Sequence, residues 1–189
     1  MKYPNSGKTY QHQWSHDTSG RGMSLESDIN QANLFYLDQD LANIHKKPTP
    51  IMIVNVDYPS RNKAKITEAY FKVPSTTDYN GIYKGYYIDF EAKECRSATS
   101  FPFSSIHEHQ IKHLQNVLKH GAIAFLIIRM THYDTDYLIR ADEFIEFYLT
   151  TKRRSLPFDW IKEHGHKINR KLLAPCDYLK TIDEVFLGV

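Results

Sequence analysis

Apolar and polar residues alternate most regularly in the stretch GYYIDFEAKE, residues 85–94. Alternation with a period of two predicts a half-buried β-strand, because successive side chains of a strand point to opposite faces. The two faces of this predicted strand carry different residues: Ile88, Phe90 and Ala92 on the apolar face, and Asp89, Glu91 and Lys93 on the charged face.

Turn-forming residues precede this strand, namely Asn80-Gly81 and Gly85. We therefore expect the chain to double back and to bring Asp78, from a neighbouring segment, beside Glu91. The lysine two residues after Glu91 points the same way, because strand side chains repeat every two residues. The predicted cluster contains two carboxylates and one ammonium group.

Ahead of these turns, the pattern predicts a helix and then a hairpin. Ser24 is a suitable N-cap, and apolar residues at helical spacing continue to about His45. The apolar face of this predicted helix consists of Leu25, Ile29, Leu37, Leu41 and Ile44. Residues 51–58 and 65–73 predict two strands joined by a basic, polar segment, which together form an extended hairpin.

The hairpin has two interpretations. It is either a simple meander within the sheet or a projection that contacts DNA. In the second case, basic side chains reach phosphates and aromatic side chains contact unstacked bases. The residues assigned to DNA contact are Arg61, Lys63, Lys65, Tyr70, Phe71 and Lys72.

Helical and strand patterns continue after the alternating stretch. A helix is expected from about Ile106 to His120, ending at Gly121, and GAIAFLIIRM is expected to form a fully buried central strand. The remaining predicted elements are a strand at residues 136–140 and helices at residues 141–149 and 176–186. Residues 152–175 are assigned no element. This order of elements predicts an α/β fold with a mixed sheet.

The composition is that of an ordinary globular domain. The 189 residues are 41% hydrophobic and 24% charged, and a formal net charge of +2 is too small to indicate nucleic-acid binding by itself. Residues 1–22 lack periodicity and are expected to form a flexible tail, which leaves residues 23–189 as one domain. The two cysteines fit a reducing compartment, and the chain carries neither a signal segment nor an apolar run of about 20 residues. We expect a cytoplasmic protein without membrane contact.

The cluster of Asp78, Glu91 and Lys93 suits metal-assisted hydrolysis of a phosphodiester. Hard cations such as Mg²⁺ prefer carboxylate and other oxygen ligands, and a nearby ammonium group stabilises the negative charge that develops during hydrolysis. Spacing alone does not decide the matter, because Glu-x-Lys also occurs on ordinary solvated strand edges.

Two further features bear on metal chemistry. Glu26 lies in the first turn of the first predicted helix, where it either favours the helix dipole or projects toward the carboxylate cluster. His109 and His113 lie one helical turn apart, but Ile111 breaks the H-E-x-x-H pattern and no cysteine lies near, which disfavours a zinc site.

Five segments carry a resemblance to a known family: RGMSLE at 21–26, IHKKPTPIMIVNVDYP at 44–59, EAYFKVPSTTDYNGIYKGYYIDFEAKE at 68–94, TSFPF at 99–103 and HEHQI at 107–111. In order and spacing they resemble the RecU-type Holliday-junction resolvases of Gram-positive bacteria, a branch of the PD-(D/E)xK nuclease superfamily. The resemblance implies a restriction-endonuclease-like mixed β-sheet core flanked by helices, with a protruding β-hairpin stalk at about residues 58–72.

The same resemblance assigns roles to individual residues. By position, the family's metal site corresponds to Thr76, Asp78, Glu91 and Gln110. Its transition-state lysine corresponds to Lys93, and the first-helix acid of the wider superfamily corresponds to Glu26. Asp78 follows a threonine instead of the proline of the superfamily motif, as is usual in this branch.

The resemblance also implies an activity and partners. It implies a Mg²⁺-dependent homodimer that cuts four-way DNA junctions by symmetric paired incisions during recombination and repair, leaving 5′-phosphate ends. It further implies a link to a RecA-type recombinase, which no residue of this chain indicates independently. Two rivals stay open: a related nuclease that reads duplex sequence, and a junction-binding accessory protein that does not cut.

Overall fold

A mixed sheet forms the centre of the molecule. The computed structural model describes residues 24–60, 62–72 and 76–189, and within these ranges the sheet has six strands in the order β1-β4-β5-β7-β8-β10. Their bounds are β1 Ala42–Lys46, β4 Tyr79–Tyr83, β5 Tyr86–Cys95, β7 Ile123–Met130, β8 Thr135–Arg140 and β10 His166–Lys167. Only β5 and β7 pair in parallel among these described strands. The expected tail at residues 1–22 lies outside the described residues.

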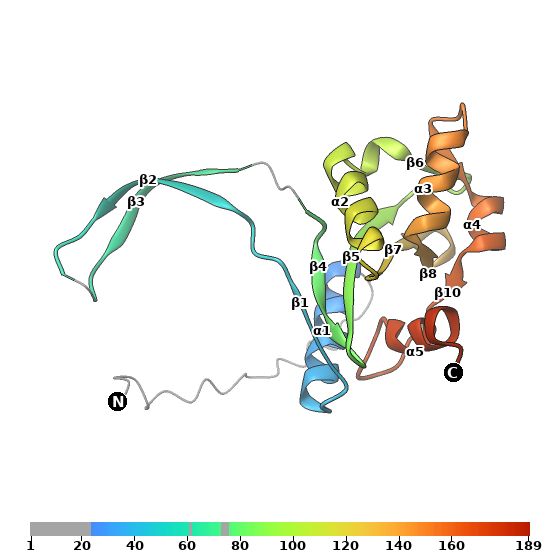
Figure 1. Cartoon of the computed structure of the whole chain (residues 1–189), viewed down its shortest axis with the longest axis horizontal. Coiled ribbons are helices and arrows are strands. Elements are labelled where there is room, and N and C mark those ends of the chain that lie inside the picture. The colour runs from blue at the N-terminus through green and yellow to red at the C-terminus, as the bar shows by residue number, and fades with distance from the viewer. Residues whose placement is uncertain (1–23, 61, 73–75) are drawn as a thin grey trace.

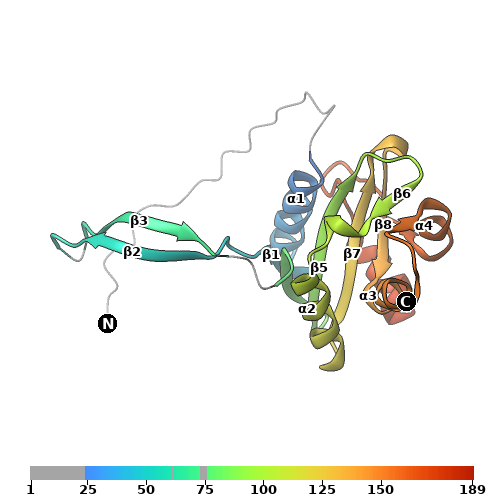
Figure 2. The same ribbon diagram turned by 90° about the horizontal axis from the view of Figure 1, so that it is seen from above.

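Helices cover both faces of this sheet (Figures 1 and 2). The elements outside the sheet are α1 Leu25–Asp38, α2 Glu108–Lys119, α3 Ala141–Thr150, α4 Phe158–His164, α5 Tyr178–Ile182, the short strands β6 Ser100–Pro102 and β9 Ser155–Pro157, and the single turns η1 Phe103–Ser105, η2 Thr131–Tyr133 and η3 Asp183–Leu187. One hydrophobic cluster packs α1 and α5 against one face, and a second packs α2, α3 and α4 against the other. The predicted α/β class, with a mixed sheet flanked by helices, is confirmed.

The alternating stretch forms β5, with the two faces that its sequence predicts. Phe90 stacks between Tyr79 and Phe125 on the α1 side, with ring centroids 4.8 and 4.7 Å away. The prediction that the strand is half-buried is wrong, because Asp89 and Glu91 are both fully buried. Since β5 lies between two other strands and α2 packs on its charged side, no edge or face of its centre is left to solvent.

The turn before β5 differs from the sequence prediction. Asn80 and Gly81 lie inside β4, and the chain reverses at Lys84 and Gly85, which both have positive φ angles of 49° and 83°. A glycine is required at position 81 for another reason: a Cβ atom there would lie 2.1 Å from the carbonyl oxygen of Asn43.

The first helix ends earlier than predicted. Ser24 caps α1 as expected, but the helix stops at Asp38, and residues 42–46 form β1 instead of helix. The chain leaves the helix through Asp40, which adopts a left-handed conformation with φ of 52°, and the Leu41 N–H donates back to the Tyr36 carbonyl. Ile44 is buried through strand pairing with β4, whereas Leu41 is half exposed.

The extended hairpin is separate from the central sheet. Strands β2 Ile51–Asp57 and β3 Lys65–Phe71 pair only with each other among the described residues, and Figures 1 and 2 show them projecting away from the rest of the molecule. The interpretation as a meander within the sheet is therefore wrong. Every residue of β2 is exposed, and the paired strands begin at Ile51, ahead of the bounds of about 58–72 expected for the stalk.

The second half of the chain follows the predicted order. The expected helices and strands correspond to α2, β7, β8 and α3 within one or two residues at each end. The expected closing helix is shorter, because α5 ends at Ile182 and continues as the π-helical turn η3. Residues 152–175, which were assigned no element, contain β9, α4 and β10. No helix among the described residues is long and apolar enough to cross a membrane.

Candidate functional site

Strand pairing brings Asp78 and Glu91 together. Tyr79 is paired with Phe90 across β4 and β5, so the preceding residue, Asp78, lies opposite Glu91. The Asp78 N–H donates to Glu91 Oε2 at 3.1 Å, and Lys93 Nζ lies 2.6 Å from Glu91 Oε1. Two carboxylates and one ammonium group therefore meet at the start of β4.

Glu91 is strongly perturbed by this environment. Its side chain is fully buried, and burial together with the neighbouring Asp78 carboxyl group raises the pKa of Glu91 to about 8, although Lys93 opposes the shift. Burial disfavours the charged form, and a second carboxyl group nearby adds repulsion. When both carboxyl groups are ionised, the site carries more negative charge than its single lysine balances.

The donor chemistry of this site fits a divalent cation. Carboxylate oxygens are the ligands that Mg²⁺ prefers, and a cation would relieve the repulsion that raises the Glu91 pKa. No group of three or more His, Cys, Asp or Glu side chains in the described ranges is arranged to hold a metal ion. A cation beside Asp78 and Glu91 would therefore depend on hydroxyl, amide or carbonyl oxygens, water and substrate for its other ligands.

Thr76 and Gln110 are the expected sources of such oxygens. Thr76 lies two residues before Asp78, and its hydroxyl donates to the carbonyl of Thr77 at 3.3 Å. Gln110 is buried in the first turn of α2, where its Oε1 accepts from the His107 N–H at 2.9 Å. A carbonyl-type oxygen has two lone pairs, so this capping bond leaves Gln110 Oε1 able to accept one more interaction.

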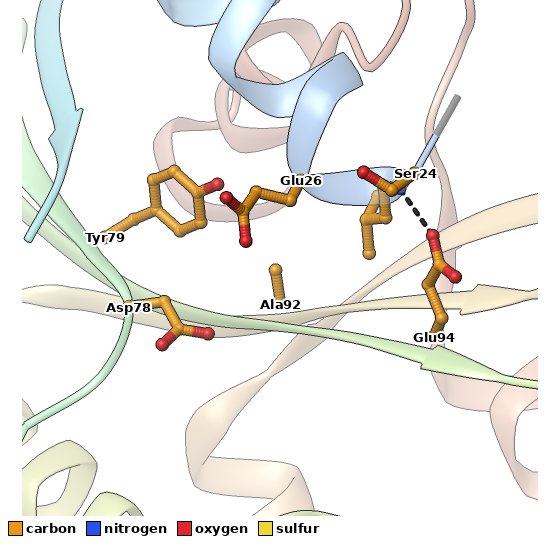
Figure 3. A pocket seen from close by; sticks show the side chains of 7 residues that line it. Ser24, Glu26, Asp78, Tyr79, Ala92 and Glu94 are labelled. Carbon is orange, nitrogen blue, oxygen red and sulfur yellow. Dashed lines mark hydrogen bonds between the residues drawn. The ribbon is translucent and has the colours of Figure 1, made fainter. Parts of the chain in front are cut away.

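Glu26 lies on the other side of the strand. It lines a cavity of about 160 Å³ together with Asp78, Tyr79, Ala92 and Glu94 (Figure 3). Its carboxylate is half exposed and pairs with Lys46 Nζ at 2.5 Å. Ala92 and Glu94 point to the opposite face from Glu91 and Lys93, so Glu26 reaches the carboxylate cluster only where Asp78 borders this cavity.

A second buried acid was missed by the sequence reasoning. Asp89 is fully buried, and its carboxylate contacts Lys47, Thr77, Tyr87 and His113. The signal was present, because Asp89 shares the charged face of β5 with Glu91. His113, one of the two histidines considered for a zinc site, contacts this acid: its Nε2 lies 3.1 Å from Asp89 Oδ2.

The residues expected to contact DNA are spread along the hairpin. Lys63, Lys65 and Lys72 are exposed, and Phe71 is 83% exposed. Tyr70 is 56% exposed, and its hydroxyl donates to Glu68 at 2.8 Å. Arg61 lies outside the described residues. None of the described side chains in this set belongs to the carboxylate cluster, so the hairpin and the cluster are two separate parts of the chain.

Comparison with known proteins gives a family match over most of the chain. Residues 20–184 match the family described as "RecU: Recombination protein U". The chain is 47% identical over 202 aligned residues to the Holliday junction resolvase RecU of Staphylococcus aureus (strain JH9), covering 99% of this chain and 97% of that relative. The protein of the same description from Staphylococcus aureus (strain MRSA252) matches with the same identity and coverage.

A solved structure is similar at a much lower level. Hjc of Archaeoglobus fulgidus, described as a Holliday junction resolvase from an archaeal hyperthermophile, aligns with a TM-score of 0.41 and 9% identity. The alignment covers 74% of this chain and 93% of that one. So distant a likeness carries no argument, whereas the sequence matches extend over nearly the whole chain. On the strength of those matches, the chain belongs to the RecU family.

Proposed function

We propose that this protein is a divalent-cation-dependent endonuclease that resolves Holliday junctions in DNA recombination and repair. The observation that carries the proposal is the contact of Asp78 and Lys93 with the buried Glu91. The relatives in Staphylococcus aureus are described as Holliday junction resolvases, which supports the same assignment.

The reaction is hydrolysis of a phosphodiester. A water oxygen attacks phosphorus, the bond from phosphorus to the 3′-oxygen breaks, and that oxygen takes up a proton, leaving 5′-phosphate and 3′-hydroxyl ends. Asp78 and Glu91 hold the cation, with Thr76 and Gln110 as further oxygen donors. When bound, Mg²⁺ supplies positive charge to the phosphate oxygens and lowers the pKa of bound water.

Lys93 acts beside the carboxylates. Its ammonium group lies 2.6 Å from Glu91 Oε1, and strand geometry directs both side chains to the same face. There it stabilises the negative charge that develops on phosphorus-bound oxygen, or orients the attacking water. Glu26, on the far side of β5, adds a further carboxylate in the cavity that it shares with Asp78.

Substrate choice is assigned to the hairpin and to a symmetric dimer. A four-way junction has pseudo-two-fold symmetry, so a C2 homodimer presents two identical sites to two equivalent strands. The exposed lysines of the hairpin contact phosphates, and Tyr70 and Phe71 contact bases that the branch point leaves unstacked. Partners are thus junction DNA, a second copy of the chain and, by family, a RecA-type recombinase in the cytoplasm.

The test compares an immobile four-way junction with a linear duplex, in Mg²⁺ and in EDTA. Paired symmetric cuts on the junction alone are expected for the wild-type protein, and Glu91→Ala and Asp78→Ala are expected to lose cleavage while still binding the junction. Glu108→Gln is a matched control, since this α2 carboxylate is exposed and pairs only with Lys112 among the described residues.

Each rival predicts a different result in the same assay. Equal cutting of the linear duplex would keep the nuclease activity and reject the junction resolvase. Tight junction binding without cleavage in Mg²⁺ would indicate an accessory protein and would overturn the catalytic assignments.

A further inference from the structure

A buried polar cluster lies directly behind the carboxylate site. Asp89 Oδ2 lies 2.8 Å from Lys47 Nζ, 3.0 Å from the Tyr87 hydroxyl and 3.1 Å from His113 Nε2, while Asp89 Oδ1 accepts from the Thr77 hydroxyl. Lys47 Nζ also donates to Thr77 Oγ1 at 2.8 Å. Both oxygens of a fully buried carboxylate are therefore satisfied by groups from four different segments.

These segments include both connections between the hairpin and the sheet. Lys47 lies between the end of β1 and the start of β2, on the connection that enters the hairpin. Thr77 lies between the end of β3 and the start of β4, on the connection that returns from it. The backbone joins the same two connections, because the Lys47 N–H donates to the Asp78 carbonyl at 2.8 Å.

The same cluster adjoins the site through two of its residues. Thr77 immediately precedes Asp78, whose N–H donates to Glu91. Asp89 is one strand repeat before Glu91 and points to the same face. A shift of Thr77 relative to Asp89 would therefore change the separation of Asp78 and Glu91.

We propose that Lys47, Thr77 and Asp89 form a clasp that sets the position of Asp78 against Glu91 and couples it to the base of the hairpin. These three are positioning residues, since they act through Asp78 and Glu91. The inference rests on the proposed function, because a junction held by the hairpin then also fixes the connections that carry the cation-binding carboxylate.

Burial explains why the clasp holds its geometry. Hydrogen bonds to a charged group in a water-poor interior are stronger than in solvent, and a buried charge left without partners is costly. The Lys47 side chain is only 17% exposed, so its ammonium group stays on Asp89 and Thr77 and is poorly placed to contact DNA itself. In this respect Lys47 differs from the exposed lysines of the hairpin, which are assigned to phosphate contact.

The first experiment compares Lys47→Met and Thr77→Val with the wild type and with Lys112→Met, a control lysine that is exposed on α2. Single-turnover cleavage of the junction is expected to fall about 10- to 100-fold in both clasp variants, the size of effect that a misplacement of about 1 Å produces. The Mg²⁺ concentration for half-maximal rate should rise, while junction affinity in EDTA stays within about twofold of wild type. Wild-type rates and Mg²⁺ requirement in both variants would overturn the proposal.

A second readout does not depend on activity. Amide hydrogen exchange without metal should be faster at Asp78 and Tyr79 in the variants, and unchanged in α3. Thr77→Val keeps the Lys47–Asp89 ion pair, so it stays informative if Lys47→Met folds poorly. Two results would reject the clasp and show that the cluster only stabilises the fold. One is faster exchange throughout the protein, and the other is an exchange rate at residues 78–79 that does not differ from wild type.

The two proposals fail in different ways. If the wild-type protein shows no cation-dependent cleavage, the proposed function is wrong, and the exchange experiment still tests whether the clasp fixes Asp78. If the wild type cleaves and the clasp variants cleave equally well, the proposed function stands and the clasp is rejected.

Discussion

The hairpin β2–β3 and the central strand β7 are both rich in apolar residues, yet they have opposite environments. Every residue of β7 is buried, with neighbouring strands on both edges and helices on both faces. Every residue of β2 is exposed, although Ile51, Ile53 and Val54 resemble the residues of β7 in type. Apolar sequence therefore builds the core in one region and remains on the surface in the other.

The difference indicates separate roles for the two regions. An isolated two-stranded hairpin is only marginally stable, so its exposed apolar side chains add little to folding. Contiguous apolar surface on a soluble protein marks a contact site for another molecule. The sheet holds the carboxylate cluster in position, while the hairpin exposes apolar side chains to solvent, which supports the substrate contact proposed above.

The largest effect should come from a cavity in the core. Phe125→Ala removes a fully buried ring that stacks on Phe90, and we expect a loss of about 3–5 kcal/mol in the free energy of unfolding. Ile53→Ala on the hairpin should change this quantity by less than about 0.5 kcal/mol. Denaturant titration of both variants measures the contrast, and equal losses would show that the hairpin is part of the cooperative fold.

A second effect concerns charge inside the sheet. Because the folded-state pKa of Glu91 is about 8 against an ordinary 4.5, the folded protein binds one more proton than the unfolded chain between these values. Stability should therefore fall as pH rises from about 4.5 to 8 and change no further above that. Glu91→Gln should stabilise the metal-free protein at pH 8 by on the order of 3 kcal/mol and have little effect at pH 4.

Thermal melting of the metal-free protein at both pH values measures this prediction. Glu108→Gln serves as its control, because that carboxylate is exposed. A stabilisation of Glu91→Gln that is the same at pH 4 and pH 8 would contradict the raised pKa. Saturating Mg²⁺ should stabilise the wild type at pH 8 and so reduce its difference in stability from Glu91→Gln, since a ligand that binds only the folded state stabilises it.

A smaller effect is expected on the hairpin, and on binding alone. Phe71→Ala removes an 83% exposed ring, and stacking on an unpaired base contributes about 1–3 kcal/mol, so junction affinity should fall roughly tenfold. Stability should be unchanged. Leu172→Ala is a control of similar exposure outside the hairpin. Fluorescence anisotropy with a labelled junction in EDTA gives the affinities, and an equal loss in both variants would argue against a specific hairpin contact.

The smallest effect is on salt dependence. Lys63→Ala and Lys65→Ala should each reduce the slope of log affinity against log salt by about one, because each phosphate contact releases about one counterion. Lys112→Ala on α2 should leave the slope unchanged. If neither hairpin variant alters the slope, the tip of the hairpin does not contact phosphates.

Much of the fold and part of the site were predictable from local pattern. The two-residue repeat of β5 placed Glu91 and Lys93 on one face, and the ten-residue apolar run at β7 indicated a buried central strand. These features depend on the chain alone, because side-chain direction in a strand follows from backbone geometry. The sequence also carried enough of the family pattern to indicate a nuclease before any geometry was known.

Other features depended on contacts between distant segments. The end of α1 was misplaced because Leu41 and Ile44 continue a helical spacing, and only pairing with β4 shows that Ile44 belongs to a strand. Asn80-Gly81 reads as a turn in isolation, but the close approach of β1 requires glycine there within a strand. In both cases tertiary packing overrode the local signal.

The same distinction applies to the site. The sequence by itself determined which acids and which lysine share a face of β5. Only the tertiary structure decided that Glu91 and Asp89 are fully buried, that Lys47 reaches Asp89 from 42 residues away, and that the hairpin stands apart from the sheet. The physical reason is that burial and long-range ion pairs depend on what the rest of the chain packs against a residue, which no local pattern contains.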